Sequence, residues 1–330
     1  MQGSKTFLPI GRRAFVAGGL LLPAASAHVL ADEPGLSDVH VVAADLRFPE
    51  GPVAMPDGSL LFVEILGGTV SRLTPEGKVS AIASGLTGPN GLAMGPDGAC
   101  YVCQNGGRPD AMGGGKVQRL DLATGEMRLL YDKCEGRRFD GPNDLVFDKS
   151  GGMWISDFIA GAIFWAKADG SEVRLIDGNV PRSNGIALSP DGGTLYIAQQ
   201  PRKLLAYRIT APGRVAQAHG RADARLLSDL DGNFRYDSMK TGADGDVYVA
   251  AWWGGILRLS PTGKLKATYA VPDWSITNLS FGGRDRRDLF LTGVPVPAPA
   301  PGAPPPSVMG LKGSLFKARA PAPGLRLNYT

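Results

Sequence analysis

The chain has 330 residues, of which 43% are hydrophobic, so it can bury either two ordinary domains or one large core. Its 35 basic and 31 acidic residues give a net charge of +4 and are spread along the chain, without the basic run expected for a nucleic-acid partner. The 46 glycines and 26 prolines favour short strands joined by tight turns and argue against long helices.

Near the N-terminus, Arg12 and Arg13 precede a short apolar stretch and then small residues. This pattern is typical of a twin-arginine export signal, with cleavage expected after Ala27 or Ala31. The apolar stretch is too short to cross a hydrocarbon layer about 30 Å thick as a helix, so no lasting membrane anchor is expected. We therefore predict that residues 1–31 are an export signal and that the mature protein is exported, to the periplasm of a bacterium.

Six similar phrases follow one another along the rest of the chain. Each has a polar residue, an apolar strand, a turn such as Pro-Asp-Gly and a second apolar strand. The phrases begin at Glu50, Asn90, Asn143, Asn184, Asp237 and Asn278, which are 40, 53, 41, 53 and 41 residues apart. This spacing is typical of propeller blades, and Asp-Gly supplies the positive φ of a tight hairpin. We therefore predict an all-β fold, a six-bladed β-propeller with four-stranded blades, over residues 37–330.

Two segments near the C-terminus have distinct expected roles. The sequence Gly313-Ser-Leu-Phe-Lys should provide the third strand of the last blade and close the ring. Residues 295–306 are rich in proline, which cannot join a ladder of hydrogen bonds, so we expect an exposed surface loop there.

The three cysteines are expected to be small buried residues. Cys100 and Cys103 lie three apart in a strand, so their side chains point to opposite faces and cannot chelate one ion. Together with Cys134 they make an odd number, which argues against a disulfide framework.

The six residues that open the phrases should form a ring. In a propeller the first strand of each blade lines the central channel, so equivalent positions face the axis at one depth. A single Asn there is explained equally well by capping of a turn, but six polar residues in register favour a site. Oxygen ligands without His or thiolate suit a hard divalent cation such as Ca²⁺ or Mg²⁺.

Further polar and aromatic residues should surround this ring. The second strands run back to the same face, and we expect the residues at their ends to form a second polar layer or a rim for the substrate. These residues are Glu64, Gln104, Asp157 and Gln199. Trp252 and its neighbour Trp253, with Phe158, could form the wall of a pocket.

Several phrases together resemble those of the senescence-marker-protein/gluconolactonase/luciferin-regenerating-enzyme family, and the resemblance covers nearly the whole mature chain. They are Phe48-Pro-Glu-Gly-Pro, Gly141-Pro-Asn-Asp-Leu, Ser183-Asn-Gly-Ile-Ala-Leu, Tyr236-Asp-Ser-Met and Thr277-Asn-Leu-Ser-Phe. The resemblance implies a six-bladed propeller with a central divalent metal, Ca²⁺ first, with Mg²⁺, Mn²⁺ and Zn²⁺ as alternatives. It further implies the ligands Glu50, Asn143, Asn184 and Asp237, with Asn90 and Asn278 beside them.

The resemblance also implies a reaction, the hydrolysis of a small lactone or related ester. In such lactonases the metal polarises the ester carbonyl and a carboxylate activates water. Asp237 is our first choice for the base and Asp144, adjacent to a ligand, is the second; a carboxylate beside a cation loses basicity, so the choice stays open. Sugar-lactone members carry an Arg where this chain has Gly141, which favours a less hydroxylated lactone.

Three other functions remain open at this stage. A phosphotriesterase-like hydrolase would use a similar fold and ligand set, and a non-hydrolytic propeller enzyme of the strictosidine-synthase type would rely on a catalytic Glu. A non-catalytic ligand-binding propeller would use the ion only to make the channel rigid. Each needs a small-molecule partner, and the sequence does not indicate an oligomeric state.

Overall fold

The computed structural model describes residues 35–107, 113–300 and 306–330, so the expected export signal lies outside the described residues. This part of the chain forms 29 strands and no helix. Accordingly, none of the described residues form a helix long and apolar enough to cross a membrane.

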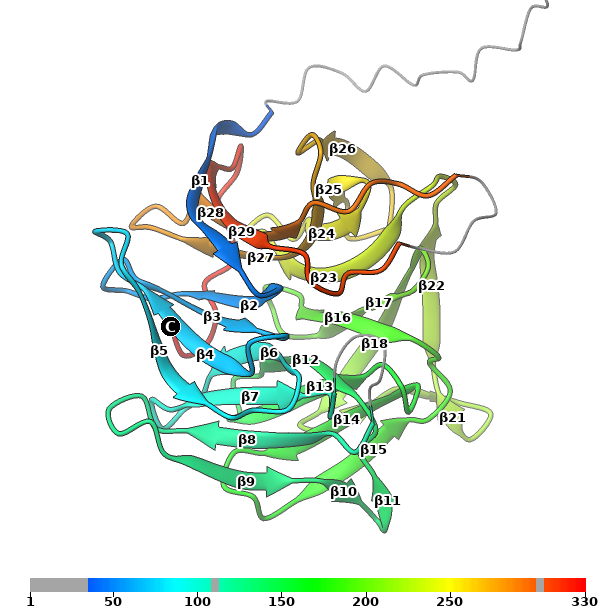
Figure 1. Cartoon of the computed structure of the whole chain (residues 1–330). Coiled ribbons are helices and arrows are strands. Elements are labelled where there is room, and N and C mark those ends of the chain that lie inside the picture. The colour runs from blue at the N-terminus through cyan, green and yellow to red at the C-terminus, as the bar shows by residue number, and fades with distance from the viewer. Residues whose placement is uncertain (1–34, 108–112, 301–305) are drawn as a thin grey trace, which may run out of the picture. The chain divides into compact units, whose positions relative to one another are not determined.

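Six antiparallel sheets are arranged as the blades of a six-bladed β-propeller, as predicted (Figure 1). The innermost strands are β2 (Pro49–Ala54), β6 (Pro89–Met94), β12 (Pro142–Phe147), β16 (Ser183–Leu188), β23 (Arg235–Thr241) and β27 (Ser275–Gly282). Each contacts the innermost strand of the next blade, and β27 contacts β2, so these strands form a closed ring.

The other strands follow outward from the ring. The second strands are β3 (Leu60–Glu64), β7 (Cys100–Gln104), β13 (Gly152–Asp157), β17 (Thr194–Gln199), β24 (Val247–Trp252) and β28 (Asp288–Val294). The third strands are β4 (Thr69–Leu73), β8 (Lys116–Leu120), β14 (Ala162–Lys167), β18 (Lys203–Ala211), β25 (Gly255–Leu259) and β29 (Gly313–Arg319). The outer strands are β5 (Val79–Ser84), β9 (Met127–Tyr131), β15 (Val173–Asp177), β22 (Ala224–Asp229), β26 (Leu265–Tyr269) and β1 (Ser37–Leu46). Short additional strands are β10 (Lys133–Cys134), β11 (Arg137–Arg138), β19 (Arg214–Val215), β20 (Gln217–Ala218) and β21 (Arg221–Ala222).

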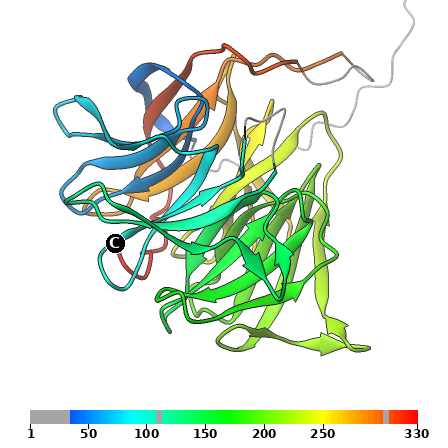
Figure 2. The same ribbon diagram turned by 60° about the horizontal axis from the view of Figure 1, so that its bottom comes forward.

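The two ends of the propeller meet in one blade. The strand β29 is the third strand of the last blade, which confirms the prediction for residues near Gly313. Its outer neighbour is β1, from the N-terminal end of the described chain, and the two pair from Ser37 with Arg319 to Leu46 with Gly313. Figure 2 shows these blue and red segments in the same blade. Hydrogen bonds between distant segments thus close the ring, a role that the sequence did not reveal for β1.

Apolar side chains fill the spaces between the blades. For example, Tyr101 of β7 packs edge-on against Phe147 of β12, with ring centroids 4.9 Å apart. The three cysteines are free and buried, as expected. Burial raises the pKa of the Cys100 thiol to about 12, so this group stays protonated and acts as a small apolar residue.

A β-bulge lies near the start of every innermost strand. The register with the second strand shifts between Glu50 and Val53 in the first blade, and at equivalent places in the other five. A bulge bends the strand and redirects the side chains within it. The residues that open the six phrases therefore lie where the backbone turns them toward the channel.

Gly51 shows how tightly the bulges of neighbouring blades pack. Its φ is +54°, and a Cβ atom there would lie 2.2 Å from the carbonyl oxygen of Asn90. Only glycine fits this conformation and this contact.

We predict that Gly51→Ala lowers the free energy of unfolding by about 3 kcal/mol, because it adds a backbone collision to the strain of positive φ. The matched control is Gly77→Ala, since Gly77 has a φ of +85° but no atom within 4 Å of the added Cβ. The control should lose only about 1 kcal/mol. Urea denaturation measures both values, and equal losses would contradict the packing argument.

Candidate active site

Five of the six residues predicted to form a ring line one cavity. Its volume is about 460 Å³, and it opens where the innermost strands begin. The five residues are Glu50, Asn90, Asn143, Asn184 and Asp237, and all are buried. The repeat therefore brings side chains from five different blades to one place.

The sixth ring residue, Asn278, lies beneath the cavity and is not part of its wall. Its Nδ2 donates to Oε2 of Glu50 at 2.7 Å, and its Oδ1 accepts from the backbone N–H of Leu279 at 2.8 Å. The predicted role beside the ligands is thus supported in one respect, since Asn278 orients the carboxylate of Glu50.

The two carboxylates of the cavity repel each other. Burial raises the pKa of Glu50 to about 7, and the negative charge of Asp144 contributes to the shift. Burial also holds the pKa of Asp237 well above its usual value, and the charge of Glu50 adds to this. The indole N–H of Trp252 donates to Oδ2 of Asp237, so the predicted wall residue contacts the carboxylate directly. Both acids would gain from a cation placed between them.

Asp144 is buried but does not line the cavity. Its Oδ1 accepts from the N–H of Leu145 at 2.9 Å, and its Oδ2 accepts from the hydroxyl of Ser238. The ammonium of Lys240 lies 3.6 Å from the same Oδ2 and 3.4 Å from Oδ1 of Asn278. Asp144 and Asn278 therefore lie at one depth, below the cavity, with Lys240 between them.

The four polar residues at the ends of the second strands hold loops and do not line the cavity. Glu64 accepts from the N–H of Arg47 at 2.7 Å, and Gln104 accepts from the N–H of Thr87 at 2.8 Å. In each pair the partner lies 17 residues earlier in the chain, in the loop that enters the blade.

The next two blades repeat this arrangement. Asp157 accepts from the N–H groups of Asp140 at 3.0 Å and of Gly141 at 2.8 Å, and Gln199 donates to the carbonyl of Pro181 at 3.1 Å. The expected rim for the substrate is therefore not formed by these side chains, because their polar atoms bind the backbone. In the fifth blade the equivalent position is Ala251, and Trp252 is the next residue. Trp252 lines the cavity, as do the residues that follow three of these polar side chains, which are Ile65, Phe158 and Gln200.

The ring residues fit a divalent cation. Oδ1 of Asn184 is buried and has no hydrogen-bond partner among the described residues, although Asn184 lines the cavity. A buried carbonyl oxygen without a partner is costly unless it binds a ligand. Glu50, Asp144 and Asp237 lie at the depth of the ring or just below it, and among the described residues one ammonium, that of the partly buried Lys240, pairs with this group, at Asp144. When all are ionised, two negative charges remain, which one divalent ion would neutralise.

The donor set depends on amide oxygens. Across residues 35–107, 113–300 and 306–330, no group of three or more His, Cys, Asp and Glu side chains is placed to hold a metal. The cavity offers two carboxylates together with the amides of Asn90, Asn143 and Asn184. Such oxygen ligands match Ca²⁺ or Mg²⁺ better than zinc.

The sequence did not reveal the residues at the mouth of the cavity. Phe48, Arg182 and Arg235 line it, and so do residues Pro306 to Met309. Pro306 is the last residue of the proline-rich segment, and Val296 near its start is buried. The expectation of a loop exposed throughout is therefore wrong at both ends. A signal was available for the arginines, because each stands two residues before a ring residue, as Phe48 does.

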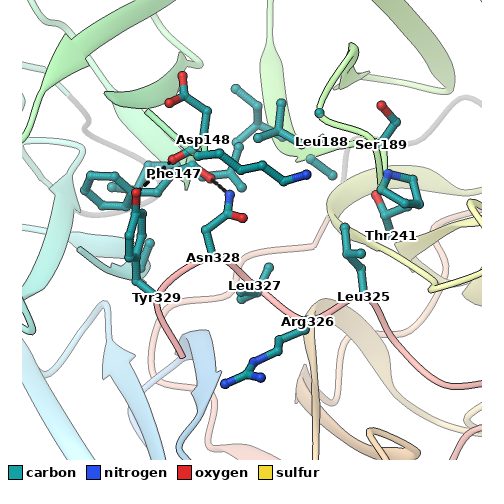
Figure 3. Close-up of a pocket in the computed structure, with 18 of the residues that line it drawn as sticks. Phe147, Asp148, Leu188, Ser189, Thr241, Leu325, Arg326, Leu327, Asn328 and Tyr329 are labelled. Atoms are coloured by element: carbon teal, nitrogen blue, oxygen red, sulfur yellow. Dashed lines mark hydrogen bonds between the residues drawn. The ribbon is translucent and has the colours of Figure 1, made fainter. Parts of the chain in front are cut away.

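A second cavity of about 400 Å³ lies at the far ends of the innermost strands. The C-terminal segment crosses it (Figure 3): Nδ2 of Asn328 donates to the carbonyl of Phe147 at 2.7 Å, and the hydroxyl of Tyr329 donates to that of Asp148 at 3.2 Å. None of the six ring residues lines this cavity, but Lys240 does. The buried charges thus lie between the two cavities, and only the first presents carboxylates of the ring.

Comparison with known proteins identifies the family. Residues 48–294 match the model of the SMP-30/Gluconolactonase/LRE-like region. The chain is 27% identical over 298 residues to the gluconolactonase of Zymomonas mobilis, an alignment that covers 77% of this chain and 78% of that protein. It is 26% identical over 258 residues to the pentonolactonase XacC of Haloferax volcanii, covering 76% of this chain and 83% of the relative.

Solved structures share the fold. A gluconolactonase from Xanthomonas campestris superposes with a TM-score of 0.68 at 21% identity, covering 85% of this chain and 89% of that one. A calcium-binding protein, regucalcin, from Agrobacterium tumefaciens gives a TM-score of 0.63 at 22% identity, covering 89% and 97%.

The loop contacts of Asp157 lead to a prediction. Asp157→Ala should lower the free energy of unfolding by about 3 kcal/mol, because the buried carboxylate accepts three backbone N–H groups, from Asp140, Gly141 and Ala160. Asp169→Ala, at an exposed turn where the carboxylate accepts from Ser171, is the control and should lose under about 1 kcal/mol. Urea denaturation tests both, and a loss at Asp157 no greater than in the control would refute its structural role.

Proposed function

Since the chain belongs to the SMP-30/gluconolactonase/LRE-like family, we propose that it is a hydrolase that opens a small lactone in the cavity lined by the ring residues. One observation carries the proposal: Glu50, Asp237 and the unpartnered Oδ1 of Asn184 all face this cavity. The relatives named gluconolactonase and pentonolactonase support lactones as the substrate class.

We propose a divalent cation, Ca²⁺ first, as the cofactor, held by Glu50, Asn143, Asn184 and Asp237. The charge balance of the ring and the amide oxygens support this choice, and the relative named as a calcium-binding protein agrees with it. When bound, the ion would act as a Lewis acid toward the carbonyl of the substrate.

The side chains of the chain itself orient the reacting groups. Asn278 fixes the carboxylate of Glu50 through a hydrogen bond of 2.7 Å, and Trp252 fixes that of Asp237. Groups held in one orientation before the reaction reduce the entropic cost of the transition state. Phe48, Ile65 and Trp252 add apolar wall, which suits the carbon atoms of a small ring.

Asp237 is the better placed of the two candidate bases. It lines the cavity, whereas Asp144 is absent from its wall and is bound to Ser238 and Lys240 below it. In the proposed reaction a water molecule gives a proton to Asp237 as its oxygen bonds to the acyl carbon. The ring C–O bond then breaks, and the proton passes from Asp237 to the departing alkoxide.

Removal of the metal should destabilise the protein, because Glu50 and Asp237 then repel each other without compensation. We expect a chelator to lower Tm by several degrees and Ca²⁺ to restore it. Terbium should replace Ca²⁺ and emit when tryptophan is excited, because Trp252 contacts Asp237. The double variant Glu50→Gln, Asp237→Asn should lose this emission. A native protein that shows neither saturable emission nor any rise in Tm with Ca²⁺, Mg²⁺ or Mn²⁺ would exclude the metal site.

A panel of γ- and δ-lactones tests the activity and the base. Asp237→Asn should lower kcat by about 100-fold or more, since general-base catalysis contributes about that much. The matched variant Asp144→Asn should bind the ion, measured by terbium emission, and lose less activity, because its side chain does not reach the cavity.

If the native protein opens no lactone but hydrolyses a phosphotriester, the lactonase assignment is wrong and the phosphotriesterase alternative stands. If it hydrolyses neither although it binds Ca²⁺, the chain is a ligand-binding propeller.

A further inference from the structure

Two arginines stand at equivalent places around the mouth of the cavity. Arg182 precedes Asn184 by two residues, and Arg235 precedes Asp237 by two. Arg182 lies directly before β16, and Arg235 is the first residue of β23. Both line the cavity, as does Phe48 at the same place in the first blade. In these three blades the residue two places before the ring residue therefore lies at the mouth of the cavity. In two adjacent blades that residue is an arginine.

Both guanidinium groups lie over aromatic rings and lack acidic partners. Cζ of Arg182 is 5.6 Å from the ring centroid of Phe158, and Cζ of Arg235 is 5.6 Å from that of Trp253. Neither forms an ion pair with a carboxylate in the part of the chain that the structure describes. The N–H groups of a guanidinium without an acidic partner can bind the two oxygens of a carboxylate.

The placement of the two arginines at the mouth is energetically unfavourable without a bound anion. Arg182 and Arg235 come from adjacent blades and line the same cavity, so two positive charges share its mouth. Arg182 also has a φ of +59°, a conformation that costs about 1 kcal/mol or more in a residue other than glycine. Strain of this kind is concentrated at positions that bind ligands.

The charges of the cavity are separated by depth. Glu50 and Asp237 lie at the ring, and the two arginines lie at the mouth. A divalent ion would compensate the negative charge at the ring, which leaves the mouth with two uncompensated positive charges. The loaded cavity would therefore attract an anion to its mouth.

We propose that the natural substrate is a lactone that carries a carboxylate, which Arg182 and Arg235 bind while the ester group lies at the ring. This inference rests on the function proposed above and narrows its substrate class to lactones of hydroxy diacids. A volume of about 460 Å³ accommodates a small ring with such a substituent.

The test compares two lactones that differ only in charge and are similar in size: γ-valerolactone and the analogue whose methyl group is replaced by a carboxylate. For the native protein we expect kcat/KM to be at least tenfold higher for the carboxylate, mainly through KM. High salt should shrink this ratio, since it screens the arginines. Arg182→Gln and Arg235→Gln should each reduce the ratio at least tenfold, and Arg182→Lys should reduce it less. Arg225→Gln, an equal loss of charge on the exposed face of β22, should leave the ratio as it was.

Binding measured without turnover separates this inference from the proposed function. Calorimetry with 2-hydroxyglutarate, the ring-opened dicarboxylate, should show binding to the Ca²⁺-loaded protein that Arg182→Gln weakens at least tenfold. If both lactones are opened equally well and neither arginine variant changes the ratio, the inference is overturned while the lactonase stands. If no lactone is opened but the dicarboxylate binds through the arginines, the lactonase and the lactone substrate are both wrong, and only the carboxylate-binding role of the arginines stands.

Discussion

Negative charge buried at the channel is the constraint on which the rest of this structure depends. Glu50, Asp144 and Asp237 come from three blades and are all buried within one region. Their mutual repulsion would drive the blades apart if the ring of sheets could open. The pairing of β1 with β29 closes that ring, and the interblade packing holds it, so the fold keeps these carboxylates together, where the cation that we propose would compensate them.

Below the ring, the positive charge of Lys240 offsets part of this negative charge. Its ammonium contacts Asp144 and Asn278, and Asn278 in turn donates to Glu50. The lysine therefore reduces the negative charge at the ring and, through one amide, helps to orient a candidate ligand. With three carboxylates and one ammonium ionised, a net charge of −2 remains, which agrees with the divalent ion that we propose.

Three positions of the blade hairpins have different roles. The residue in the bulge lines the cavity in five blades, and the residue two places earlier lines its mouth in three. The polar residue at the end of the second strand holds the entering loop in four. Substitutions at the mouth can therefore change which substrates enter without disturbing the ring. The fifth blade has Ala251 at the loop-holding position, and the next residue, Trp252, donates to Asp237.

The sequence alone determined the fold and most of the ring, because a regular spacing of turns and polar residues fixes the depth of each position along its strand. Five of the predicted positions meet at one cavity for this reason. The depth of a residue along its strand does not determine where its side chain points, however. The tertiary structure decided that Asn278 and Asp144 point below the cavity, where both lie beside the ammonium of Lys240. It likewise decided that Gln104 and its equivalents hold loops and that Arg182 lies at the mouth. These side-chain positions depend on which hydrogen-bonding groups lie within reach, and those groups come together only when the ring has closed.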